Sequence, residues 1–148
     1  MGLGIKRTDL QALAQAKLDD AMLLLQHGRY SNAYYLAGYS VELALKACIA
    51  AQFAAEVIPD KSFVNSVYQH NLKALVGLAG LSSQLKGKED ADPLFAANFA
   101  LAAQWQPDVR YETRDSLSAQ AMVVAITTQR QVSCHGSSNI GKCWAHNS

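Results

Sequence analysis

The sequence predicts an all-α protein, an up-and-down bundle of four to five helices. Apolar residues recur at spacings of three and four along several stretches, which is the period of a helix with one buried face. Of the 148 residues, 50% are hydrophobic and 17% are charged, so the chain can bury a substantial core. No convincing strand pattern or internal repeat interrupts these helical stretches. The sequence therefore indicates helices packed on helices.

The first helix is expected to begin at Thr8 and to end at His27-Gly28. Thr8-Asp9-Leu10-Gln11 has the form of a capping box, in which the first and last side chains bond to each other's backbone. Gly28 suits the left-handed backbone position that follows many helices. The apolar face between these signals is formed by Leu10, Leu13, Ala14, Leu18, Ala21, Leu24 and Leu25.

The second helix should restart at Tyr30 or Ser31 and continue to about Val57, because Pro59 disfavours helical backbone just before it. Apolar side chains occur in nearly every direction around this helix, so we expect it to be central. Small residues along it permit neighbouring helices to approach closely: Ala37, Gly38, Ser40, Ala44 and Ala47.

The next part of the chain carries weaker signals. A third helix is expected over residues 62–80, in two pieces around 69–71, and residues 82–90 indicate a polar loop. Asp92-Pro93 is a helix cap followed by proline at the first helical position, which predicts a helix from Pro93 to Trp105.

A last helix is expected over residues 116–131. Beyond it the periodicity vanishes and Ser, Asn, Gly, His and Cys dominate. We therefore expect a helical bundle domain over residues 1–131 and a polar, flexible tail over residues 132–148.

Four polar-tipped residues share one stripe of the otherwise apolar second helix: Tyr35, Tyr39, Glu42 and Lys46. Polar groups are costly to bury, so they must satisfy one another or face something else. One interpretation is a structural network that includes a Glu42–Lys46 ion pair at i, i+4. The other is a binding cleft, in which Arg110, from the connection before the last helix, pairs with Glu42.

Charge and cysteine content restrict the function classes. The net charge is +1, so no global field draws the chain to nucleic acid or to a membrane. Met1–Lys6 lacks the apolar core of a signal peptide, and charged residues interrupt the most apolar window, 33–58. Three cysteines do not make a disulfide framework. We expect a cytoplasmic protein with no membrane partner, and the low charge suggests that a partner or second copy covers some surface.

The segment Ala33–Ala47, preceded by His27-Gly28-Arg29-Tyr30, resembles the HEPN superfamily of small helical bundles. His70-Asn71-Leu72 resembles the start of that family's third helix. Residues 105–111, with Arg110-Tyr111, resemble the connection before its final helix. The resemblance extends over residues 8–126.

This resemblance implies a homodimer that binds a nucleotide or RNA, often in a toxin–antitoxin or defence setting and sometimes beside a nucleotidyltransferase-type antitoxin. We favour a non-catalytic module of this kind that needs no cofactor. Where a cation lies beside an aromatic ring, as in Arg110-Tyr111, the cation can bind a phosphate and the ring can stack on a base. The expected ligand-binding residues are Tyr35, Tyr39, Glu42, Lys46, His70, Arg110 and Tyr111.

The resemblance also implies an alternative, a metal-independent endoribonuclease. Catalytic members carry an arginine followed four to six residues later by a histidine, which moves protons around the ribose 2′-OH. Arg110 and Arg114 have no such histidine, and the one match is Arg130 with His135 at the end of the last helix. A third alternative is a pure protein-interaction bundle with no ligand.

No metal site is expected. Metal-ligand residue types occur in the tail, but they lack the short paired spacing of a zinc site. They are Cys134, His135, Cys143 and His146.

Overall fold

The computed structural model of the protein describes residues 4–134, with side chains as far as Gln129. This part of the chain contains seven α-helices, one short 3-10 helix and no strand, which confirms the all-α prediction. The elements are α1 (Arg7–Gln26), α2 (Tyr30–Ala50), α3 (Lys61–Val67), α4 (Leu72–Leu78), α5 (Ser82–Ala91), α6 (Pro93–Ala102), η1 (Pro107–Tyr111) and α7 (Ser116–Cys134).

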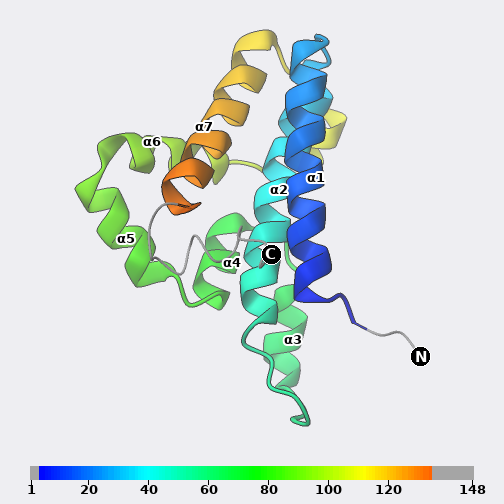
Figure 1. The fold of residues 1–148 in the computed structure, drawn as a ribbon, viewed down its shortest axis with the longest axis vertical. Coiled ribbons are helices and arrows are strands. Elements are labelled where there is room, and N and C mark those ends of the chain that lie inside the picture. The colour runs from blue at the N-terminus through cyan, green and yellow to red at the C-terminus, as the bar shows by residue number, and fades with distance from the viewer. Residues whose placement is uncertain (1–3, 135–148) are drawn as a thin grey trace.

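Helices α1 and α2 form a long antiparallel hairpin, against which α7 and α4 pack (Figure 1). Gly28 makes the turn with φ +72°, the left-handed conformation that glycine adopts without strain. The amide of Arg29 then bonds to the carbonyl of Leu24 at 2.8 Å, the backbone pattern of a glycine-terminated helix. The predicted role of Gly28 is confirmed.

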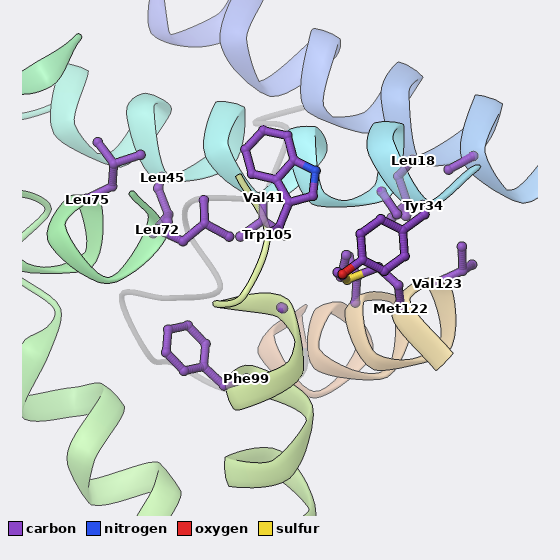
Figure 2. Close-up of a cluster of buried hydrophobic side chains, with 14 of the residues drawn as sticks. Leu18, Tyr34, Val41, Leu45, Leu72, Leu75, Phe99, Trp105, Met122 and Val123 are labelled. Carbon is purple, nitrogen blue, oxygen red and sulfur yellow. The ribbon is translucent and has the colours of Figure 1, made fainter. Parts of the chain in front are cut away.

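The core surrounds α2. Apolar side chains from α1, α2, α4, α6 and α7 meet there, together with Trp105 from the segment before η1. Removal of each such side chain from water stabilises the fold by roughly 1.5–3 kcal/mol. Figure 2 labels ten of these residues: Leu18, Tyr34, Val41, Leu45, Leu72, Leu75, Phe99, Trp105, Met122 and Val123. A smaller cluster lies between α1 and α2: Leu10, Ala14, Leu43, Ala44 and Ala47.

The two hairpin helices differ from expectation at their outer ends. Helix α1 begins at Arg7, and its capping position is Lys6, without a side-chain hydrogen bond, so the predicted capping box at Thr8 is wrong. Helix α2 ends at Ala50 rather than near Val57. Residues 51–60 are all exposed, so no packing stabilises a further turn.

The region after Asp60 is more helical than expected. The two-piece third helix is confirmed as α3 and α4, each capped by an Asp or Asn side chain. The predicted loop 82–90 is wrong, because these residues form α5. Leu85 packs half-buried on the core, and Lys86 pairs with Asp90 at 3.5 Å along the outer face. One apolar side chain per two turns was too weak a pattern to predict this helix.

Asp92 caps α6 as predicted, accepting hydrogen bonds from the amides of Leu94 at 3.0 Å and Phe95 at 3.1 Å. The final helix, α7, runs from Ser116 to Cys134, slightly beyond the expected residue 131. The division into a domain of residues 1–131 and a tail of residues 132–148 stays a prediction. Within residues 4–134, no helix has both the length and the hydropathy needed to cross a bilayer.

Candidate functional site

Glu42 is the buried centre of the polar stripe on α2, with 2% of its surface exposed. Its carboxylate lies 3.9 Å from the ammonium of Lys46, one turn further along the helix. The carboxylate also accepts a short hydrogen bond from Nδ1 of His70. The expectation that Glu42 needs a partner is confirmed, and the main partner comes from a different part of the chain.

The local fold explains how His70 reaches Glu42. Asn71 caps α4, accepting a hydrogen bond from the amide of Ala74 at 3.0 Å. Leu72, with 1% exposure, anchors the first turn of α4 in the core. His70 lies two residues before this anchor and is therefore held beside α2. Its bond through Nδ1 leaves Nε2 on a half-exposed ring, and among the described residues Nε2 has no hydrogen-bond partner.

Three aromatic rings stack next to the stripe. The rings of Tyr35 and Tyr39 are 6.0 Å apart and nearly parallel, and Trp105 lies 6.0 Å and 6.2 Å from them. The indole Nε1 of Trp105 donates to the backbone oxygen of Tyr35 at 3.1 Å. Gly38, one helical turn after Tyr35, leaves the space that the indole fills.

Trp105 was not predicted as a site residue. The sequence does contain a signal for it. Gly38 follows Tyr35 by three positions and directly precedes Tyr39, and a glycine in such a setting marks a place where a large side chain can approach the helix.

Arg110 does not pair with Glu42, so the cleft interpretation was wrong in this detail. Its guanidinium lies 4.8 Å from the ring centre of Tyr111, in a cation–π contact. Hydrogen bonds to Tyr111, and secondarily to Tyr35, raise the pKa of Arg110, which keeps it charged. Arg110 is therefore a surface cation tied to two phenols, one of them in the aromatic stack.

Tyr39 is held in its neutral form. Burial raises its pKa above the ordinary value of a tyrosine, and the nearby charge of Glu42 adds to this effect. A neutral phenol can both donate and accept a hydrogen bond, and its ring can stack on a base or another apolar surface.

A groove of about 380 Å³ lies between the start of α4 and η1. We call it the His70/Arg110 groove. It brings together two of the predicted site residues from segments that are 40 positions apart in the chain. Three of the remaining lining residues offer amide or carboxylate hydrogen-bonding partners: Asn71, Gln106 and Asp108; the fourth, Pro107, is apolar. The groove thus has donors, acceptors and one permanent positive charge, beside stacked aromatic rings.

The predicted catalytic pair lies outside the described region. Arg130 falls in α7 beyond the last described side chain, and His135 follows the last described residue. Within residues 4–134, no group of three or more His, Cys, Asp or Glu side chains has the arrangement of a metal site.

The chain matches a known protein family. A family model described as HEPN domain matches residues 9–88, which is more than half of the chain. The matched region runs from α1 into α5 and includes the polar stripe and His70, while Arg110 lies beyond it. Neither the curated proteins nor the solved structures contain a significant match.

Proposed function

This chain belongs to the HEPN domain family, and on that premise we propose that it is a non-catalytic module that binds a nucleotide or a short RNA segment. The proposed binding site is the His70/Arg110 groove with the adjoining aromatic stack. The observation that carries this proposal is the meeting of His70 and Arg110 on one groove, although α4, α5 and α6 lie between them in the chain.

The chemistry of the groove suits a nucleotide. Its volume falls in the range of about 300–1,000 Å³ that is usual for small-molecule sites. Arg110 can bond a phosphate through two N–H groups, and His70 can donate or accept at Nε2. Asn71, Gln106 and Asp108 can bond to base edges or ribose hydroxyls. Bases stack on aromatic side chains in single-stranded RNA recognition, and Tyr111 is exposed beside Arg110.

The buried carboxylate has a supporting role in this proposal. Glu42 fixes the ring of His70 through Nδ1, so that Nε2 faces away from the carboxylate. Lys46 adds positive charge near the same carboxylate oxygen, Oε1 of Glu42. Because Glu42 is almost fully buried, it would orient His70 and would not contact the ligand itself.

We also propose that the protein forms a homodimer. Helix α7 exposes Leu117 and Val124, which lie two turns apart on one face, and α1 exposes Leu13 and Leu23. Covering such residues with a second copy would remove apolar surface from water. Sedimentation should show a dimer that Leu117→Arg weakens. The control is Leu94→Arg, which changes another well-exposed leucine, on α6.

The family resemblance further suggests a toxin–antitoxin setting with a nucleotidyltransferase-type antitoxin as partner. Co-expression with the product of an adjacent gene of that type tests this proposal. A stable co-purified complex would support it. Two proteins that separate completely at low salt would contradict it.

The binding proposal is tested by titration calorimetry with AMP, a tetra-adenylate RNA and the matching DNA. We expect the RNA to bind best and Arg110→Gln to weaken it by about tenfold, since a charge-assisted contact is lost. Arg29→Gln is the matched control, because Arg29 is an exposed arginine beside a tyrosine outside the groove. Absence of binding by all three ligands at millimolar concentration would leave the protein-interaction bundle as the better hypothesis.

A further inference from the structure

A second cavity lies at the lower end of the hairpin in Figure 1, where the start of α1, the end of α2 and α3 come together. Its volume is about 540 Å³. It shares no lining residue with the His70/Arg110 groove. Most of its wall is apolar, formed by Leu10, Ala50, Phe53, Val64, Val67 and Tyr68. We call it the apolar cavity.

The apolar cavity includes large hydrophobic side chains that are exposed to solvent. Tyr68 is 72% exposed, and Phe53 and Ile5, which also line the cavity, are well exposed. The ring of Phe53 lies 5.4 Å from the ring of Phe63 in a tilted contact, which supports it from one side. Water against these side chains costs free energy that an apolar ligand would recover.

The charges at the apolar cavity are all of one sign. Lys6, Arg7 and Lys46 line it, and none of its described lining residues is acidic. Arg7 already has an interaction within the chain, so Lys6 and Lys46 carry this argument. Lys6 is exposed, and the contact of Lys46 with Glu42 is long, at 3.9 Å. Both ammonium groups can therefore form shorter bonds to an anion.

We propose that the apolar cavity binds a small anionic amphiphile, a molecule with an apolar body and one carboxylate head. The body would cover Phe53, Val64 and Tyr68, and the head would bond to Lys6 and Lys46. A free molecule fits better than a membrane lipid, because a recessed cavity encloses a ligand on several sides. Lys46 would then join this site to the Glu42–His70 pair.

Calorimetry with dodecanoate, below its micelle concentration, tests the proposal. We expect one molecule to bind per chain, about tenfold more tightly than dodecyltrimethylammonium, which has the same tail and the opposite charge. Lys6→Gln should weaken the binding of dodecanoate by roughly threefold to tenfold. Lys73→Gln should leave this binding unchanged, because Lys73 is an exposed lysine on α4 that does not line the cavity. Equal binding of both amphiphiles would overturn the proposal.

A cavity-filling variant supplies a second test. Val64→Trp should weaken the binding of dodecanoate by at least about tenfold, because the indole would occupy the space of the ligand's apolar body. Val57→Trp is the control, since Val57 is exposed and does not line the cavity. If circular dichroism shows that Val64→Trp is unfolded, Phe53→Asp replaces it, because Phe53 lies in the exposed segment after α2.

Two other occupants would give different results. If dodecanoate dissociates a dimer of the wild type in sedimentation, the apolar cavity is an interface between copies and the proposal is wrong. If the protein co-sediments with anionic vesicles and does not bind free dodecanoate, a membrane lipid is the ligand and the proposal is also wrong. Neither result depends on nucleotide binding, so the proposal can fail while the proposed function stands.

Discussion

Gly38 lies directly against the indole of Trp105, so closely that a Cβ at position 38 would be 2.1 Å from Cδ1 of the tryptophan. Trp105 is 1% exposed and also bonds to the backbone of α2 through its indole N–H. It cannot move aside without leaving the core and separating from the rings of Tyr35 and Tyr39. The glycine in the middle of α2 is therefore a requirement of tertiary packing.

The first prediction is that Gly38→Ala destabilises the protein. Alanine improves helix propensity by about 1 kcal/mol, but overpacking of a core costs about 1–3 kcal/mol and more when the neighbour is rigid. We expect a net loss of roughly 2 kcal/mol in the free energy of unfolding by urea, with a shift in tryptophan fluorescence.

The matched control for Gly38→Ala is Gly87→Ala. Gly87 lies inside the exposed helix α5, and a Cβ there would meet nothing within 4 Å. Its replacement should raise stability by about 0.5–1 kcal/mol. A Gly38→Ala protein as stable as the wild type, with unchanged fluorescence, would contradict the packing argument.

The sequence predicted the hairpin well because its signals are local. Gly28 ends α1 through its own backbone conformation, and Asp92 with Pro93 begins α6 through its own hydrogen bonds. The predictions that were wrong depend on contacts between distant parts of the chain. Thr8 has capping chemistry, but α1 begins before it, and Val57 lies in a segment that finds nothing to pack against. Propensity decides a helix only where packing does not override it.

The second prediction concerns Glu42 and His70. His70→Ala would leave a carboxylate of 2% exposure with only the distant Lys46, at a cost of about 1–3 kcal/mol. His70→Gln should cost less than half as much, because an amide N–H can replace the imidazole donor. Urea unfolding of both variants measures these losses.

A double-mutant cycle separates this pair from general damage. Once Glu42→Gln has removed the charge, His70→Ala should cost clearly less than it does in the wild type. Equal costs in both backgrounds would show that the two side chains do not stabilise each other.

The site was only partly predictable for the same reason. The stripe of Tyr35, Tyr39, Glu42 and Lys46 follows from helical spacing, and so does the need of Glu42 for a partner. The choice between His70 and Arg110 as that partner does not follow, because it depends on where the α3–α4 turn and η1 settle against α2. Long-range placement of this kind has no signature in local sequence.

The third prediction is a dependence of stability on acid pH through Asp115. Its carboxylate accepts a hydrogen bond from the amide of Ser118 at 2.8 Å at the start of α7, and this bond lowers the pKa of Asp115. The ionised carboxylate of Asp115 therefore stabilises the fold above the ordinary aspartate pKa of about 3.9. This stabilisation is lost as the pH falls through the lower pKa that Asp115 has in the folded state.

Asp115→Asn isolates this effect, because the amide oxygen still caps the helix but does not titrate. The stability difference between wild type and Asp115→Asn, measured by urea unfolding, should change between pH 5 and pH 2 and stay flat above pH 5, where the carboxylate is ionised in both states. A parallel pH dependence of the two proteins would assign the acid sensitivity to other carboxylates.

The last prediction decides between the binding module and the ribonuclease. Arg110 and Arg114 precede α7 without a histidine at catalytic spacing, so we expect no RNA cleavage by the purified protein without added metal. Gel analysis of a labelled RNA measures this. If cleavage leaving 2′,3′-cyclic ends is seen, His135→Ala should abolish it and His146→Ala should not, because the acid–base role requires a histidine at fixed spacing from Arg130. Such a result would replace the non-catalytic proposal, whereas cleavage that survives His135→Ala would exclude that arginine–histidine pair as its source.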